Sequence, residues 1–172
     1  GWHCVFVTAA IKQPQLGHIS RQACVIYKLM PVAIHKFDNE SVDDSLIESQ
    51  TRSASSADYL ADNMARAPVL FIPCIAGRTD SEATSNIIAQ TGTLGSIIPA
   101  AWNFMLAARA RGLGTAWTTL HLMQEKAVAD IIGIPYDDYM QIALIPIAYT
   151  KGTDFKKAYR PSVDTVMHFN EW

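Results

Sequence analysis

The residue types that perform side-chain catalysis are scattered through this sequence and form no recognised catalytic motif. There is no G-x-S-x-G nucleophile elbow, Walker loop, H-E-x-x-H pair or EF-hand loop. Gly112-Leu-Gly114 is not a dinucleotide fingerprint, because it follows a predicted helix rather than a strand. The five histidines are dispersed, whereas metal sites need clustered ligands, so we predict no metal site. If the chain is an enzyme, we expect a bound cofactor to carry its chemistry and no catalytic side chain.

The three cysteines, Cys4, Cys24 and Cys74, are widely spaced and form no C-x-x-C pair. This spacing favours neither a disulfide framework nor a zinc site. Cys4 and Cys74 lie in apolar runs of strand length, where we expect inert core thiols. Free thiols, together with the lack of a signal peptide in the sequence, favour a reducing cytoplasm.

Length and charge narrow the class of protein. A chain of 172 residues is typical of one domain, which we expect to span residues 1–172. Its 14 Lys and Arg against 16 Asp and Glu give a net charge of −2, with no basic run to indicate a nucleic-acid partner. The longest apolar helix candidate is too short to cross a bilayer, so no membrane partner is expected.

The stretch from Gly95 to His121 organises the chain. Between Ile97 and Ala108 only Asn103 is polar, which predicts a central helix buried on all sides. Ser96 can cap this helix, Pro99 would fall in its first turn, and Gly112 can close it in the left-handed conformation.

An extended strip over 115–120 is predicted after the glycine corner, because its residues are mostly β-branched or aromatic. Such a strip offers free backbone groups to a ligand. The same pattern is also typical of an ordinary core helix followed by an ordinary strand, and spacing alone leaves both interpretations open.

Three apolar strands are predicted at 2–8, 69–75 and 141–149, and Pro73 indicates an edge or exit of the second. Helices are expected within 9–22, 55–66 and 123–132, the last closed by Gly133 and Pro135. The polar segments 36–56 and 77–93 are expected to be exposed loops, with room for a short helix at 42–47. Strands with helices between them predict a mixed layered structure.

Several short motifs together carry a family resemblance. They are Gly112-Leu-Gly-Thr115, Trp117-Thr-Thr119, Gly133-Ile-Pro135, the strand ending at Tyr149, and Tyr159-Arg-Pro161. In this order and spacing they resemble the FMN-dependent nitroreductase family, and actinobacterial-type members in particular. The resemblance covers nearly the whole chain. Gly1–Val7 is similar to the strand that follows the family's N-x-Q-x-W segment, so we expect the family's N-terminal phosphate-binding segment to be missing here.

The resemblance implies an α+β fold, a three-layer sandwich whose central mixed or antiparallel sheet is flanked by helices. It also implies a homodimer with FMN at the interface. In the family, the strip after the glycine corner lies along the isoalloxazine ring, and a backbone N–H there points at flavin N5. In this chain the strip comprises Thr118, Thr119, Leu120 and His121.

The phosphate of FMN would be gripped by Arg160, with Lys157 or Lys156 as a helper, because a guanidinium fork pairs well with phosphate oxygens. The turn at Ser96, Ile97 and Ile98 would contact the flavin from the partner side. With only these cations, we expect FMN to be retained more weakly than by a chain that carries the missing segment.

The implied activity is a two-step reaction in which NADH or NADPH gives a hydride to flavin N5 and leaves. A small-molecule acceptor, such as a nitroaromatic or quinone, then takes the electrons. We expect segments 36–56 and 77–93 to form the pocket walls. Three alternatives remain: a flavin-binding or sequestering protein without turnover, a specialised flavin enzyme of the same fold, and an interaction domain without flavin.

Overall fold

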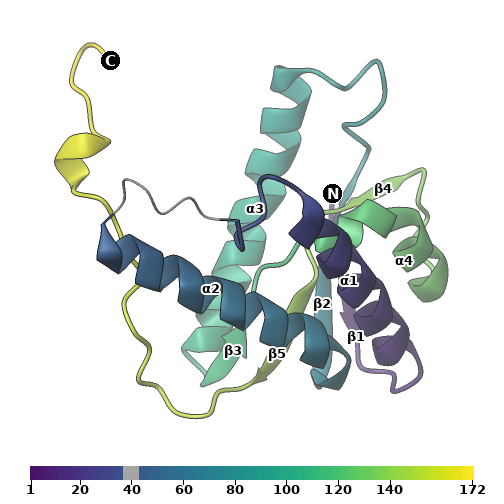
Figure 1. Cartoon of the computed structure of the whole chain (residues 1–172). Coiled ribbons are helices and arrows are strands. Elements are labelled where there is room, and N and C mark those ends of the chain that lie inside the picture. The colour runs from purple at the N-terminus through teal and green to yellow at the C-terminus, as the bar shows by residue number, and fades with distance from the viewer. Residues whose placement is uncertain (37–42) are drawn as a thin grey trace.

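The chain folds into a five-stranded sheet with helices on both faces (Figure 1). The computed structural model describes residues 1–36 and 43–172. The strands are β1 (Trp2–Val7), β2 (Val69–Ala76), β3 (Leu113–Thr115), β4 (Tyr139–Gln141) and β5 (Ile145–Tyr149). The helices are α1 (Lys12–Leu29), α2 (Asp44–Asn63), α3 (Ile87–Arg109) and α4 (Glu125–Ile132), with short 3-10 helices at Met64–Arg66, Leu120–Gln124 and Val163–Thr165.

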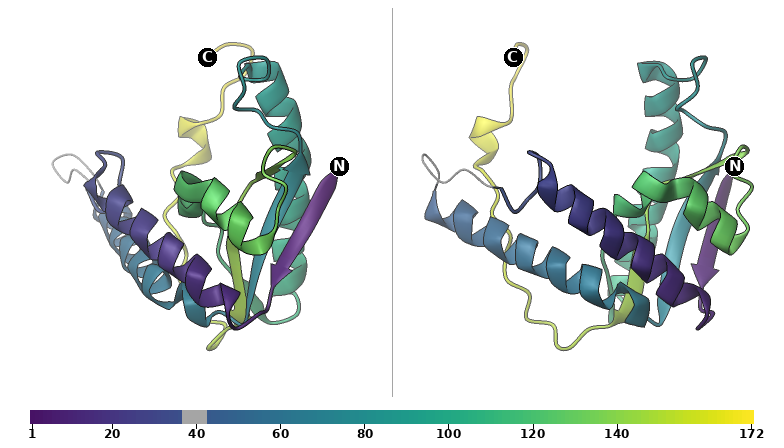
Figure 2. Two further views of the ribbon diagram at one scale, coloured as in Figure 1. Left: turned by 90° about the vertical axis from the view of Figure 1, so that its right-hand side faces the viewer. Right: turned by 45° about the vertical axis from the view of Figure 1, so that its right-hand side comes forward.

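The layers are α1, α2 and α4 on one face of the sheet and α3 on the other (Figure 2). The strand order is β1-β2-β5-β3, β4 also pairs with β2, and every strand pair is antiparallel. The expected α+β three-layer fold is therefore confirmed, with an antiparallel sheet.

The central strand β2 contains Pro73 and continues to Ala76, so the prediction that this proline marks an edge or exit was wrong. β2 pairs with β5 through Val69–Phe71 and with β4 through Cys74–Ala76. Pro73 falls where β2 changes partner, and a missing N–H is tolerated at such a break. The predicted strand 141–149 is likewise divided into β4 and β5, with buried residues 142–144 between them.

The first strand, an apolar run in the sequence, forms an edge of the sheet. The side chains of Trp2 and Phe6 are exposed, and so is Cys4, which we had expected in the core. Cys74 is buried as expected. An apolar run fixes strand character but does not distinguish an edge strand from a central one.

Helix α2 replaces most of the loop expected over 36–56. The Asp43 carboxylate accepts a hydrogen bond from the Ser45 N–H and caps the helix. Inside it, the Thr51 and Ser53 hydroxyls donate to carbonyls four residues earlier, which satisfies side chains that otherwise favour loops. Residues 37–42, including part of the helix considered at 42–47, lie outside the described residues.

Helix α1 is also longer than the short helix expected within 9–22. The predicted helix 55–66 is the carboxyl-terminal half of α2 with the following 3-10 turn.

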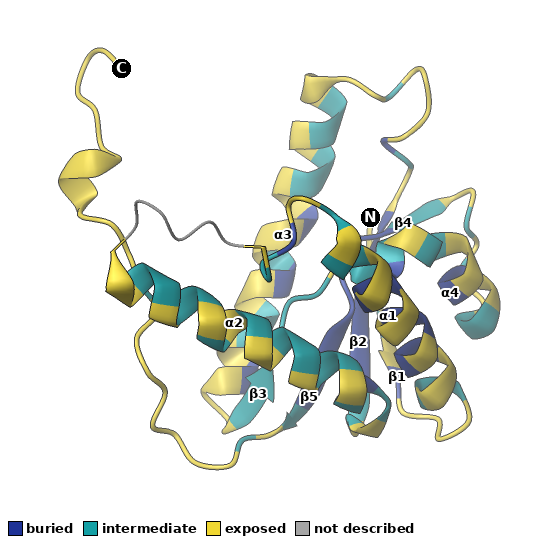
Figure 3. Ribbon diagram, viewed as in Figure 1, coloured by how far each residue is buried: buried dark blue, intermediate teal, exposed yellow. Residues whose placement is uncertain are grey.

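Helix α3 begins nine residues before Ser96, the residue we expected to cap it. Asn86 caps the helix instead, with its side chain accepting a hydrogen bond from the Ala89 N–H. Ile97 is buried against the sheet, whereas Trp102 and Leu106 are exposed. Figure 3 shows exposed and less exposed positions alternating along α3. The prediction of burial on all sides was wrong for the single chain, because α3 is an outer layer. None of the helices in the described part of the chain has the length and apolar character needed to cross a lipid bilayer.

Two cores lie on opposite faces of the sheet. On the α1 and α4 face, Leu16, Ile72 and Val128 belong to one buried cluster. On the α3 face, Phe71 packs with the partly buried Phe104. At the crossing of α1 with the Met64–Arg66 turn, Gly17 is so close to its neighbour that an added Cβ would lie 2.7 Å from the Ala65 Cβ.

Replacing Gly17 with alanine should destabilise the protein, because two Cβ atoms cannot approach this closely and the helices must separate. We expect Gly17→Ala to lower the free energy of unfolding by about 1–3 kcal/mol in urea denaturation. Gly92→Ala is the control, since Gly92 also lies in a helix but has nothing within 4 Å of an added Cβ. Equal stability of the two variants would contradict the close contact.

Candidate functional site

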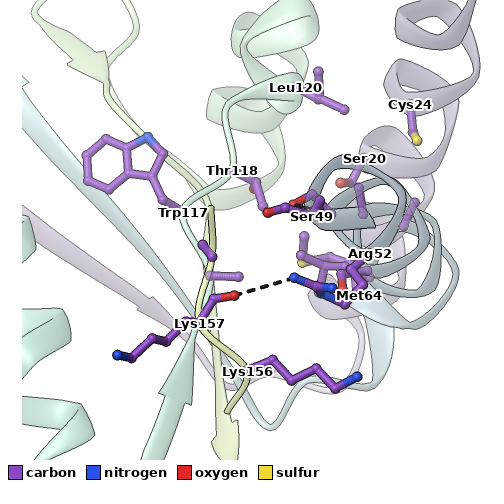
Figure 4. Close-up of a pocket in the computed structure, with 17 residues that line it drawn as sticks. Ser20, Cys24, Ser49, Arg52, Met64, Trp117, Thr118, Leu120, Lys156 and Lys157 are labelled. Carbon is purple, nitrogen blue, oxygen red and sulfur yellow. Dashed lines mark hydrogen bonds between the residues drawn. The ribbon is translucent and has the colours of Figure 1, made fainter. Parts of the chain in front are cut away.

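A cavity of about 640 Å³ lies between α1, α2, the strip after β3 and the segment 156–158 (Figure 4). Its size is typical of sites for small organic ligands. It lies on the α1 and α2 side of the sheet, and its lining comes from four parts of the chain that are far apart in sequence.

Helix α2 forms one wall of the cavity. Ser49, Arg52, Ser53 and Ser56 line it at spacings that place them on one face of the helix. Further along the same face Leu60 takes over, so the wall changes from hydroxyl and guanidinium groups to apolar groups. A cavity of this kind suits a ligand that has both an apolar surface and a polar end.

The strip after β3 forms the opposite wall, and Thr118 fixes it to the sheet. The Thr118 hydroxyl donates to the Leu144 carbonyl at 2.5 Å, and the Thr118 carbonyl accepts from the Leu144 N–H at 2.8 Å. The neighbouring Trp117 packs against the apolar clusters on the α3 face. Thr118 and Leu120 line the cavity, and Thr119 lies between them at the start of the 3-10 helix.

His121, the last residue of the predicted strip, has a side chain that is fully buried in the core. Neither ring nitrogen has a hydrogen-bond partner among the described residues. Burial lowers the pKa of the imidazole to about 4, so the ring is neutral at physiological pH. The side chain does not line the cavity.

The segment after β5 crosses the cavity and is held at both sides. The Tyr159 N–H donates to the Ser49 hydroxyl at 3.2 Å, and the Arg52 guanidinium donates to the Lys157 carbonyl at 3.4 Å. On the other side, the Arg109 guanidinium lies 4.2 Å from the centre of the Phe155 ring. These contacts place Lys156 and Lys157 in the lining of the cavity.

The two lysines extend in different directions. In Figure 4 the Lys156 side chain extends to the side on which α2 lies, and the Lys157 side chain extends the other way. Arg160 does not line the cavity; its exposed guanidinium donates to the Tyr159 carbonyl at 2.7 Å.

The predicted partner-side contacts lie on α3, away from the cavity. The Ser96 hydroxyl accepts a hydrogen bond from the Trp2 indole N–H, Ile97 is buried, and Ile98 is exposed. The single chain therefore brings Thr118, Leu120, Lys156 and Lys157 together and leaves Arg160 and these three residues outside.

Sequence reasoning expected a pocket wall within 36–56, but it missed that this wall is a helix and named none of the α2 residues that line the cavity. The signal was the i, i+3, i+4, i+7 spacing of Ser49, Arg52, Ser53 and Ser56, hidden in a segment that we expected to be a loop. Part of 36–56 does line the cavity, but no residue of 77–93 does so. Across residues 1–36 and 43–172, no group of three or more His, Cys, Asp or Glu is placed to hold a metal ion.

Comparisons with known proteins agree on the fold. The model of the family described as "Nitroreductase family" matches residues 1–149. A BluB-like flavoprotein from Clostridium difficile 630 is 15% identical, with a TM-score of 0.63 over 99% of this chain and 80% of the other. The FMN-dependent nitroreductase NfnB from Mycobacterium smegmatis, solved in complex with NADPH, is 15% identical, with a TM-score of 0.60 over 99% and 79%.

A third structure of similar fold is an oxidized iodotyrosine deiodinase bound to FMN and 3-iodo-L-tyrosine. It is 14% identical, with a TM-score of 0.60 over 99% of this chain and 77% of that chain. The curated protein sequences gave no match to this chain.

Acidification should destabilise the fold through His121. In the unfolded chain the imidazole has a pKa near 6.5, whereas in the folded chain its pKa is about 4. Between these values the unfolded state binds a proton and the folded state does not, so the free energy of unfolding falls as the pH drops. From pH 6.5 to pH 5 we expect a loss of about 1.6 kcal/mol of unfolding free energy from this residue. His121→Leu should show that much less pH dependence in urea denaturation. His168→Leu, which replaces an exposed histidine, is the control, and identical profiles for both variants would contradict the assignment.

Proposed function

This chain belongs to the Nitroreductase family, and we propose that it is an FMN-dependent NAD(P)H oxidoreductase that reduces nitroaromatic or quinone-type acceptors. The observation that carries the proposal is the cavity, whose lining combines an apolar wall with the basic residues Arg52, Lys156 and Lys157. Structures of similar fold include an FMN-dependent nitroreductase in complex with NADPH and a deiodinase bound to FMN.

The residues of the cavity suit a phosphorylated flavin. We infer that the strip of Thr118, Thr119, Leu120 and the backbone of His121 lies along the flavin ring. Lys157 and Lys156 would contact its phosphate, and Arg160 adds positive charge beyond them. The flavin, when bound, supplies the ability to accept a hydride and pass on two electrons.

The chain's own contribution is binding and orientation. The two hydrogen bonds between Thr118 and Leu144 hold the strip, and therefore its backbone donors, in one position. Leu60 and Met64 give the cavity a water-excluding surface. Burial raises the pKa of the Cys24 thiol, so this cavity residue stays protonated and is no nucleophile at neutral pH.

We infer that the active unit is a homodimer. Ile98, Trp102 and Leu106 are exposed on α3 and form an apolar surface that a monomer rarely leaves uncovered. A second copy seated on this face would cover it. The contact between Ser96, Ile97 and Ile98 and the partner's flavin stays a prediction of the resemblance, because these residues lie on α3, away from the cavity.

The visible absorption spectrum of the purified chain, before and after adding FMN and desalting, tests the proposed function. We expect a retained flavin spectrum that NADH or NADPH bleaches under anaerobic conditions and a nitroaromatic or quinone restores. Bound flavin that neither donor bleaches would favour a flavin-sequestering protein. A chain that takes up no FMN would overturn the proposal.

Removing the hydroxyl of Thr118 tests the strip. Thr118→Val keeps the shape of the side chain but loses the hydrogen bond to Leu144, so the strip is held less firmly. We expect FMN affinity to fall by about 2–10-fold, the equivalent of one hydrogen bond. Thr51→Val is the matched control, because its hydroxyl donates to the Ile47 carbonyl on α2, away from the cavity lining. An unchanged affinity in Thr118→Val, measured by flavin fluorescence, would rule the strip out as a binding element.

A further inference from the structure

We propose that Arg52 of α2, together with Lys156 and the Ser49 hydroxyl, forms a phosphate-binding subsite in the cavity. The inference rests on the proposed function and deepens it, because it assigns a phosphate contact to a helix that the resemblance did not implicate. Within the single chain, Arg52 lines the cavity and Arg160 does not.

The guanidinium of Arg52 is placed for a ligand. Its side chain is 35% exposed, and it lies on the face of α2 that forms the cavity wall. Among the described residues it donates to the Glu48 carboxylate and, over a long 3.4 Å contact, to the Lys157 carbonyl. An arginine has five N–H donors in a fixed fork, so further donors remain available to an anion.

Neighbouring groups add charge and donors. The Lys156 side chain extends to the α2 side of the cavity (Figure 4). The Ser49 hydroxyl oxygen accepts from the Tyr159 N–H, which leaves its own proton free to donate to a ligand. The guanidinium of Arg52 is paired with one carboxylate, that of Glu48. With Lys156 included, the net charge of these three groups is positive and favours an anion.

A phosphate monoester matches this set of donors. The guanidinium fork can bind two of its oxygens, while the ammonium of Lys156 contributes a point charge and Ser49 a neutral donor. Such a phosphate can belong to the flavin cofactor or to the nucleotide that donates the hydride. The chemistry of the subsite is the same for both.

The test compares FMN with riboflavin, which lacks the phosphate, on the full chain and on Arg52→Gln. We expect Arg52→Gln to weaken FMN binding by about 10–100-fold, the range for a hydrogen bond to a charged group, with riboflavin binding unchanged. Arg111→Gln is the control, because Arg111 is an exposed arginine outside the cavity. Unchanged riboflavin binding also shows that the variant is folded.

A second variant separates binding from a purely structural role. In Glu48→Gln the competing carboxylate is lost and the guanidinium is released to the ligand, so phosphate binding should strengthen by about twofold. If Arg52 only stabilised α2 through its pair with Glu48, this variant would weaken binding instead.

Two further probes identify the source of the phosphate. If Arg52→Gln affects 2′,5′-ADP binding and leaves FMN binding unchanged, the subsite serves the nucleotide donor. If the chain binds no flavin, the proposed function is overturned, but the subsite can still be tested. In that case the binding of inorganic phosphate is measured by calorimetry. Equal binding of all three probes to the wild type and Arg52→Gln would overturn the subsite.

Discussion

The cavity depends on how the chain leaves the sheet after β3. The pairing of β3 with β5 ends at Thr115, and the next residues would be free to swing away. Thr118 prevents this, because its carbonyl and hydroxyl both bond to Leu144 in the buried segment between β4 and β5. Trp117 packs on the α3 face and adds a second anchor. One wall of the cavity is therefore as rigid as the sheet core.

Two of the other walls, α2 and the segment after β5, are held much less firmly. Helix α2 has no fully buried residue, and the segment after β5 reaches it through single hydrogen bonds to Ser49 and from Arg52. The cations of the cavity come from segments about a hundred residues apart, which explains why no local motif revealed them. A search for short motifs finds sites whose residues are close together in sequence. This site instead forms where α2 meets the segment that follows β5.

Much of the fold followed from local sequence. Gly133 adopts the left-handed conformation that ends α4, as the Gly133 and Pro135 pair predicts. The start of α3 did not follow, because Ser96 was expected to cap the helix, whereas the Asn86 side chain caps a helix that begins at Ile87. The resemblance placed Thr118 in the site. Arg52 escaped it, because its position depends on α2 being a helix at all.

The unequal walls have a thermodynamic consequence. The cavity face of α2 changes from hydroxyl groups near Ser49 to apolar groups near Leu60, and in the single chain these apolar groups border a cavity. A ligand that fills the cavity would bury Leu60 and Leu120, which line it. Binding then supplies packing that the sequence of α2 does not provide by itself. A ligand that binds only the folded chain stabilises it by linkage. Helix α2 should gain most stability, because it has no fully buried residue in the single chain.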